Sequence, residues 1–530
     1  MKFQRAIGPL GLLFAGISSV IGSGWLFGPL FAAQIAGPAA IVSWLLGGIL
    51  MIVIALTFAE LGTTFPVAGG MIHFAEKSHG HLMSFMIGWM VWISSVAVAP
   101  VETIGLLQYA ANYLPALVTT SEGMHVLTTY GIIAAALIML LMCVLNYYGA
   151  QFFSRSNSVI TIIKLIVPIA TVIILIGFNF HLSNFALGTT GGFAPFGWHG
   201  ILAALPLGGV IYSFIGSNTI LQLAGETKNP QISIPLALIG AMIFCAILYV
   251  LLQVAFIGAI TPAAFAEGWD KLHYAGDRGP FSGIMMAMGL SWFVMIIYAD
   301  ALISPFGTGY VFTASTARVG YGLSEIGFLP ASLKKLTKKG VPFRCIMLNF
   351  AIGLLLFLPF PGWQKLVSFV ISCFIVSYII GPISLIVLRK TQPHVARPFT
   401  LPYAKTIALT AFYICNLLIF WTGWQTVGKM MIVLGIGLLY YIYSCYQEKN
   451  ALALKQWRSS WWLIPYFILL TMISYLGTFG EGKNIIPFGV DFAVIGVLTL
   501  VVFYFALKSS DPNNYVDAGV YPVLEPVQEL

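Results

Sequence analysis

Hydrophobic residues run along almost the whole chain in long stretches, interrupted by short segments of charged residues, prolines, glycines and polar turns. A helix needs roughly 20 apolar residues to cross the hydrocarbon core of a bilayer. Cutting the chain at the polar interruptions predicts fourteen such helices, with twelve as the alternative count. They are expected at residues 7–36, 38–62, 84–113, 126–148, 157–178, 201–224, 233–260, 283–317, 343–360, 364–388, 405–424, 428–446, 461–480 and 487–507.

The composition points to the same class of protein. Of the 530 residues, 59% are apolar and 8% are charged, whereas charged residues make up about 25% of an ordinary soluble domain. The sequence therefore predicts an all-α polytopic membrane protein and excludes a substantial soluble domain. The first apolar run is too long for the core of a signal peptide, so we expect an uncleaved helix. The six cysteines lie in or beside apolar segments without metal-ligand spacing, which predicts buried thiols and no metal site.

The distribution of basic residues predicts the orientation. With the N-terminus in the cytoplasm, 19 of the 25 Lys and Arg residues fall on the inner side and 5 on the outer side, and Lys164 remains within a span. Because positive residues accumulate in cytoplasmic loops, both termini should be cytoplasmic in the cell (inner) membrane. The net charge of +8 follows from this topology and gives no reason to expect a nucleic-acid partner.

Two predicted spans contain residues that weaken a helix. Ile21, Gly22, Ser23 and Gly24 lie within the first span, and residues 215–218 (Ile-Gly-Ser-Asn) lie within the sixth. Exposed backbone at membrane depth is tolerated only where it lines a cavity. Interruptions in corresponding positions of two chain halves indicate the binding site of a secondary transporter, whereas close helix packing is the alternative reading of the glycines.

Five groups of residues occur in order over the first 400 positions. They are Val20–Gly24 with Phe27 and Pro29; Ala59–Gly62 with Phe65, Pro66, Gly69 and Gly70; Ser213–Gly216 with Ala224–Pro230, Ile234 and Pro235; Arg318 with Gly327–Pro330; and Leu388–Lys390 with Arg397–Phe399, Leu401 and Pro402. In this order they resemble the motifs of the amino acid–polyamine–organocation (APC) transporters. The four spans after residue 400 make the chain similar to a bacterial branch of aspartate–proton symporters.

The resemblance implies a fold of two inverted five-helix repeats (LeuT-like) with about four additional C-terminal helices. We expect the first repeat at residues 1–195, the second at 196–400, the accessory helices at 401–508 and a short cytoplasmic tail at 509–530.

An amino acid at mid-membrane needs hydrogen-bond donors for its carboxylate and acceptors for its ammonium group. Ser23 and Gly24 stand where a broken helix offers free N–H groups and the positive end of a helix dipole. The expected acceptors are the backbone carbonyl groups of Val20, Ile21, Phe214 and Ile215. The resemblance implies the same assignment at the same positions.

Three further side chains are candidates for the substrate site. Tyr212 falls where the family often has an aromatic residue that closes over the substrate, and Phe312 falls near the substrate in the eighth span. Packing is the alternative for both. Asn218 stands where many relatives have glutamate, which removes any coupling role for a carboxylate there but leaves an amide that can bind a substrate side chain.

Ionisable residues within a bilayer are costly, so each is a functional candidate by default. Lys164 lies in a segment that resembles the fifth helix of proton-coupled family members, where a lysine fills the space of a sodium ion. Glu102 and Asp300 lie inside the third and eighth spans and could relay protons or pair with Lys164. Asp491 is expected to be structural, and Glu60 is expected at the inner gate or in the packing.

These features predict an importer of an amino acid, with an acidic substrate such as aspartate or glutamate as the best guess, driven by proton symport through alternating access. The coupling ion is expected to be H⁺ rather than Na⁺, without other cofactors. An amino acid exchanger and a neutral amino acid permease are the nearest alternatives, and a polytopic membrane enzyme is a distant one. No clustered His, Asp or Ser supports an enzyme, and no filter segment supports a channel. The oligomeric state is left open.

Overall fold

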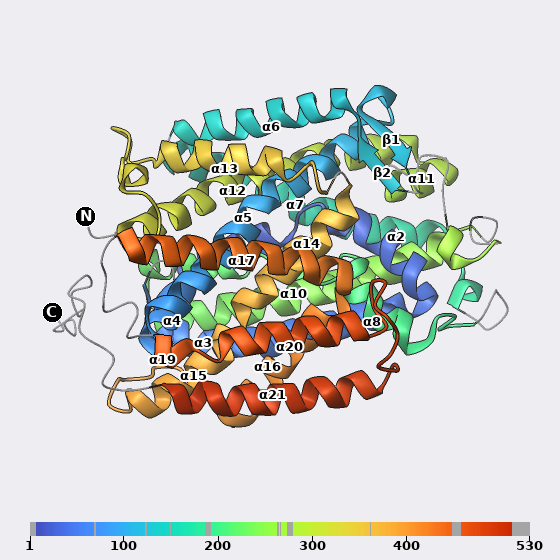
Figure 1. The fold of residues 1–530 in the computed structure, drawn as a ribbon. Helices are drawn as coiled ribbons and strands as arrows, with labels where there is room; N and C mark the ends of the chain where they lie inside the picture. The colour runs from blue at the N-terminus through green and yellow to red at the C-terminus, as the bar shows by residue number, and fades with distance from the viewer. Residues whose placement is uncertain are drawn as a thin grey trace.

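The structure is a computed structural model. It describes residues 7–67, 70–121, 124–148, 150–185, 192–261, 264, 267–272, 279–360, 362–447 and 457–510, without the side chains of 150–159, 226 and 447. Its helices lie side by side along a common direction (Figure 1). The β1–β2 hairpin and α11 lie at one end of the bundle, and α4 and α19 lie at the opposite end.

The elements follow the apolar runs of the sequence. The first part comprises α1 (Pro9–Val20), α2 (Gly24–Ala36), α3 (Ala40–Thr64), α4 (Gly70–His79), α5 (His81–Ala110), β1 (Val118–Ser121), β2 (Met124–Leu127), α6 (Thr129–Tyr147) and α7 (Ala150–Phe178). The second part comprises α8 (Gly197–Leu207), η4 (Tyr212–Phe214), α9 (Asn218–Gln222), α10 (Pro230–Ala259), η7 (Trp269–Lys271), α11 (Pro280–Ala287), α12 (Ser291–Glu325), α13 (Phe343–Leu355), α14 (Trp363–Tyr378) and α15 (Ile380–Thr391). The last part comprises α16 (Ala404–Trp421), α17 (Trp424–Gln447), α19 (Trp457–Ser460), α20 (Leu463–Leu476) and α21 (Val490–Ser509).

The chain is an all-α polytopic membrane protein, as predicted. Every predicted span overlaps a helix, but the count of fourteen is not confirmed. Among the described residues, 11 helices are long and apolar enough to cross a membrane, or 12 with the bent pair Gly197–Leu207 and Tyr212–Gln222. The count of 12 falls short of fourteen for two reasons. The stretch Gly24–Thr64 joins α2 to α3 as one span while α1 has only 12 residues, and α13 has only 13 residues. The division into inverted repeats stays a prediction.

Two predicted boundaries differ from the structure. The span expected at 126–148 begins as a helix only at Thr129, because Val126 and Leu127 pair with Thr119 and Val118 in the β1–β2 hairpin. The span expected at 283–317 is divided into α11 and α12 by a turn in which Gly289 has a φ of +74°. Since left-handed backbone suits glycine, this residue allows the turn within an apolar run.

The centre of the bundle is formed by α5 and by α14 with α15. In each of these two spans, 94% of the apolar window is buried inside the protein. Helix α5 packs against α12, α14, α4 and α6. A helix that is hydrophobic around its whole circumference is buried on all sides, so polar side chains on α5 face the protein interior and not lipid.

His79, the last residue of α4, joins two of the C-terminal helices, α19 and α21, to the rest of the bundle. Its side chain is buried, and its Nε2 lies 2.9 Å from the carbonyl oxygen of Ala506 in α21. Its own carbonyl oxygen accepts hydrogen bonds from the hydroxyls of Ser459 and Ser460, at 2.6 and 3.1 Å. Helices α19 and α21 therefore supply hydrogen-bond partners for the side chain and the carbonyl group of His79 in α4.

Candidate functional site

The first predicted span is broken at the expected position. Helix α1 ends at Val20 and α2 begins at Gly24, with Ile21 in an extended conformation (φ −80°, ψ 103°). Backbone groups in such a break lack helical partners and must be satisfied by other groups. The Ile21 carbonyl oxygen accepts a hydrogen bond from Thr308 Oγ1 at 3.1 Å, and the Val20 carbonyl oxygen accepts one from the hydroxyl of Tyr249 at 3.3 Å.

The sixth predicted span is broken as well. Helix α8 ends at Leu207, and the single turn η4 and the short helix α9, which begins at Asn218, follow. The segment Tyr212–Gln222 is bent by 49° relative to Gly197–Leu207. Gly216, between η4 and α9, has a φ of +130°, and a Cβ atom there would lie 2.5 Å from the Ser19 carbonyl oxygen. The Ser19 hydroxyl donates to the Gly216 carbonyl oxygen at 3.1 Å. The two breaks therefore touch, and glycine is required for that approach.

Glu102 of α5 reaches both breaks. Its Oε2 accepts a hydrogen bond from the backbone N–H of Ser23 at 2.7 Å, and its Oε1 accepts one from the hydroxyl of Tyr212 at 2.7 Å. The side chain is 1% exposed. The carboxylate thus lies against the N-terminal end of α2, where an unpaired N–H group and the helix dipole favour a negative charge.

Lys164 connects α7 to the first break. Its Nζ donates hydrogen bonds to the Ser18 carbonyl oxygen at 2.9 Å and to Thr308 Oγ1 at 2.5 Å. The Thr308 hydroxyl then donates to the Ile21 carbonyl oxygen. Lys164 is fully buried, so its ammonium group depends on these oxygens. The structure therefore places Lys164 against the break of the first span, and its role in proton coupling remains a prediction.

Asp300 and Phe312 are both on α12, but they lie in different surroundings. Asp300 is fully buried, and its Oδ1 accepts a hydrogen bond from Ser304 Oγ at 2.9 Å. Its charge acts on Lys164. Phe312 packs against Phe374 of α14, with ring centroids 6.5 Å apart. A substrate contact for Phe312 and a proton role for Asp300 remain predictions.

The remaining predicted contacts are divided between the breaks and a separate cavity. Gly24 packs on Ser213, and Phe214 is fully buried against Trp44 and Tyr249. Asn218 lines a cavity of about 10 Å³, about the space of one water molecule. Neither polar atom of the buried Asn218 side chain has a hydrogen-bond partner among the described residues. The lining of this cavity includes neither Ser23 nor Glu102, so Asn218 stands apart from their cluster.

The arrangement of two touching helix breaks with buried charges is typical of secondary transporters, and comparisons with known proteins agree. A family model for amino acid permeases matches residues 7–442. The chain belongs to the amino acid permease family. It is 37% identical to the glutamate/serine transporter AimA of Bacillus subtilis (strain 168), over 97% of this chain and 96% of that protein. It is 35% identical to the aspartate-proton symporter of the same organism, over 97% and 98% of the two chains. The branched-chain amino acid permease BcaP is 28% identical over 84% of this chain and 94% of its own length.

The comparisons confirm the predicted APC resemblance and the transporter class. The family and these relatives are transporters and permeases, so the permease is not an enzyme, and the enzyme alternative is excluded.

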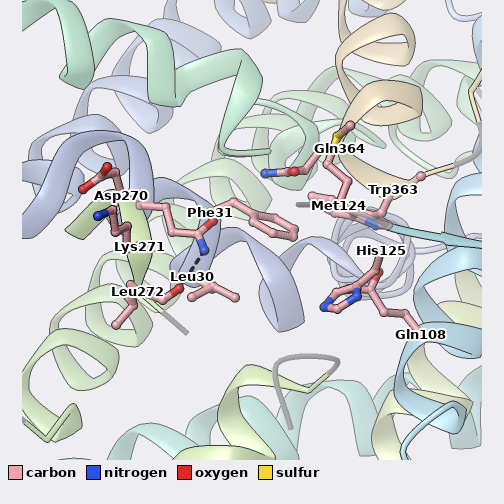
Figure 2. Close-up of a pocket in the computed structure, with 12 residues that line it drawn as sticks. Leu30, Phe31, Gln108, Met124, His125, Asp270, Lys271, Leu272, Trp363 and Gln364 are labelled. Atoms are coloured by element: carbon pink, nitrogen blue, oxygen red, sulfur yellow. Dashed lines mark hydrogen bonds between the residues drawn. The ribbon is translucent and has the colours of Figure 1, made fainter. Parts of the chain in front are cut away.

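A second cavity lies on the side of the permease that carries the β1–β2 hairpin. It has a volume of about 230 Å³ and is lined by Leu30, Phe31, Gln34, Gln108, Met124, His125, Asp270, Lys271, Leu272, Gly362, Trp363 and Gln364. Figure 2 shows Asp270, Lys271 and Leu272 on one side and Trp363 and His125 on the other. The hydrogen bond from Gln34 Nε2 to the Leu272 carbonyl oxygen, 2.8 Å, fastens η7 to α2.

Trp363 separates this cavity from the first break. Its Nε1 donates a hydrogen bond to Ser23 Oγ at 2.9 Å, and its ring packs against Phe27, Phe31 and Tyr212. The sequence did not identify Trp363 as a residue of the site. An aromatic residue directly before the apolar run 364–388 is a signal that could have indicated it. Thr308 and Tyr249 were missed as well, and no sequence pattern distinguishes them from packing residues.

Proposed function

We propose that the permease imports an amino acid by proton symport with alternating access, with aspartate or glutamate as the best substrates. Its location is the cell (inner) membrane with both termini in the cytoplasm, which accords with the excess of basic residues on the predicted inner side. The names of the relatives, a glutamate/serine transporter and an aspartate-proton symporter, support an acidic substrate.

The observation that carries the proposal is the position of Lys164 between α1 and α12. Its Nζ bonds to the Ser18 carbonyl oxygen and to Thr308 Oγ1. These oxygens could otherwise ligate a cation such as Na⁺, and the ammonium group supplies that charge itself. Loss of the proton from Lys164 would remove the charge that joins α1 to α12. Protonation would therefore control whether the first break is held against α12, which is the requirement for proton-coupled movement.

Alternating access is supported by the contact of the two breaks through Gly216 and Ser19. The half-helices on either side of a break can change their angle at the unwound residues, as hinge residues do in domain closure. Trp363 lies between Ser23 and the outer cavity and would close the outer side in this conformation.

The test is uptake of radiolabelled L-aspartate, L-glutamate and L-serine into proteoliposomes that contain no amino acid. An inward proton gradient should drive accumulation by the wild type. Lys164→Ala should lose the dependence on the gradient, whereas Lys405→Ala, which removes an exposed lysine of α16, should retain it. Uptake that requires an amino acid inside the vesicles would show exchange instead. Unchanged proton dependence in Lys164→Ala would overturn the coupling role.

A further inference from the structure

The Glu102 carboxylate accepts hydrogen bonds from groups that an amino acid substrate would use. The backbone N–H of Ser23 is the donor expected to bind the substrate carboxylate, and in the structure it donates to Glu102 Oε2 at 2.7 Å. Tyr212, expected to close over the substrate, donates its hydroxyl to Glu102 Oε1. A side-chain carboxylate of the protein therefore fills the place of a ligand carboxylate.

The local backbone is shaped around this carboxylate. A Cβ atom added at Gly22 would lie 2.6 Å from Glu102 Oε1, so only glycine lets the chain approach the carboxylate so closely. Ser23 makes no side-chain cap to α2, and its hydroxyl instead accepts the Trp363 indole N–H. The anion at the start of α2 is thus supplied from α5.

The charged and titratable groups around Glu102 come from four elements. Tyr212 of η4 donates a hydrogen bond to it, and the charge of Lys164 of α7 acts on it. The charge of Glu102 in turn acts on Tyr249 of α10. Asp300 of α12 acts on Lys164. Helix α14 contributes Trp363, which does not titrate. Lys164 is the cation whose charge acts on Glu102, and it is already shared with Asp300, so a second carboxylate beside Glu102 would have to compete for the same positive charge.

We propose that Glu102 competes with the substrate carboxylate for the Ser23 N–H. When substrate binds, Glu102 takes up a proton and, as a neutral acid, releases this N–H to the substrate. This inference rests on the proposed function and assigns the ligand class: a molecule must carry a carboxylate to displace Glu102. Two carboxylates a few ångströms apart do not both remain ionised.

The exchange is balanced. The Ser23 N–H bond to Glu102 Oε2 breaks, and the same N–H donates to the substrate carboxylate. One proton from the outer water forms an O–H bond on Glu102, and no other covalent bond changes. Aspartate or glutamate, each with one net negative charge, thus enters with one proton and adds no net charge to the site, whereas a neutral zwitterion would add one positive charge. The binding of each substrate molecule takes up one proton.

The experiment is calorimetric titration of the purified permease with L-glutamate at pH 7, in two buffers with different enthalpies of ionisation. The difference in heat gives the protons taken up per bound glutamate. The wild type should take up about one proton, and Glu102→Gln should take up close to none. Glu102→Gln should also bind glutamate about fivefold more tightly, because a neutral acceptor holds the Ser23 N–H less strongly than a carboxylate.

Two further variants make the result decisive. Thr103→Val, on the same buried turn of α5, removes a hydroxyl that bonds only to Ala99 of its own helix, and it should behave as the wild type. If Glu102→Gln does not fold, Tyr212→Phe decides, because it frees Oε1 and should tighten binding while proton uptake is retained.

The outcomes separate the two proposals. Weaker binding by Glu102→Gln, or unchanged proton uptake, would overturn the competitor role while leaving transport intact. Weaker binding by Tyr212→Phe would overturn it as well. A wild type that neither binds nor transports any amino acid would instead overturn the proposed function.

Discussion

Trp363 donates its indole N–H to the hydroxyl of Ser23 at 2.9 Å. This bond joins the first residue of α14 to the break of the first span, and the Trp363 side chain also lines the cavity of about 230 Å³. Its ring also contacts Phe27, Phe31 and Tyr212 at centroid distances of 5.4 to 5.9 Å. One side chain therefore lies between the cavity and the break of the first span, where the proposed substrate contacts lie.

Replacing Trp363 with alanine should open the outer side. Each aromatic pair is worth about 0.5–1.5 kcal/mol, so the loss should shift the equilibrium toward the open state by about tenfold or more. The measurement is the rate at which a water-soluble thiol reagent modifies Ser23→Cys from outside, with and without Trp363→Ala. Equal rates in the two proteins would show that Trp363 does not form the barrier. The exposed Trp292→Ala serves as the control.

Glu60 should contribute strongly to stability at the other end of the bundle. Its carboxylate, on α3 and 1% exposed, accepts hydrogen bonds from Arg389 at 2.8 and 2.5 Å and from the Leu401 N–H at 2.7 Å. Glu60→Gln should cost about 1–3 kcal/mol, because hydrogen bonds to a charged group are lost while Arg389 keeps access to water.

Thermal unfolding of the purified protein measures this cost as a lower transition temperature. Glu325→Gln is the control, since Glu325 bonds to Tyr321 at an exposed position and surface changes stay within about 0.5 kcal/mol. An equal transition temperature for Glu60→Gln and the wild type would contradict the prediction.

Gly216→Ala should disrupt the contact of the two breaks. A φ of +130° strains any residue with a Cβ by about 1–3 kcal/mol, and the Cβ would also meet the Ser19 carbonyl oxygen. We expect loss of amino acid uptake at normal protein levels. Gly322→Ala in α12 has no atom within 4 Å of its Cβ and should keep full uptake. Normal uptake by Gly216→Ala would show that the two breaks do not need this approach.

His79 should make the protein sensitive to acid. Burial lowers the pKa of His79 from 6.5 to about 4. Since a carbonyl oxygen only accepts, Nε2 carries the proton toward Ala506, and Nδ1 accepts from Ser78. The unfolded chain binds a proton below pH 6.5, whereas the folded chain does so only near pH 4. Stability is therefore fully present above pH 6.5 and falls as the pH drops toward 4, by about 3 kcal/mol.

The measurement is the free energy of unfolding between pH 7 and 4. His79→Gln should reduce the slope, because its amide can donate to the Ala506 carbonyl without titrating. The pKa of His73 in α4 is also lowered to about 4 by burial, so part of the slope should remain. A slope identical to that of the wild type would exclude His79 as a source.

The apolar pattern predicted where helices lie because a spanning segment must satisfy its backbone internally. Gly22 and Gly216 predicted the breaks because glycine weakens a helix, and a break in a span needs other groups to satisfy its backbone. The pairing of Glu102 with Ser23, however, joins residues 79 positions apart, and no local pattern specifies such a contact. The turn at Gly289 was missed because a single glycine within an apolar run is also common in packed helices. The bond from Trp363 to Ser23 depends on how α14 lies against α2, which the sequence does not encode locally.

His79 links the family region to the helices beyond it. The family model ends at residue 442, yet Ser459, Ser460 and Ala506 complete the hydrogen bonds of His79. Removing α19–α21 would leave buried donors and acceptors in the shared core unmet, at about 1–3 kcal/mol each. The C-terminal helices are therefore an integral part of this permease that could not be deleted to obtain a minimal transporter without repairing α4.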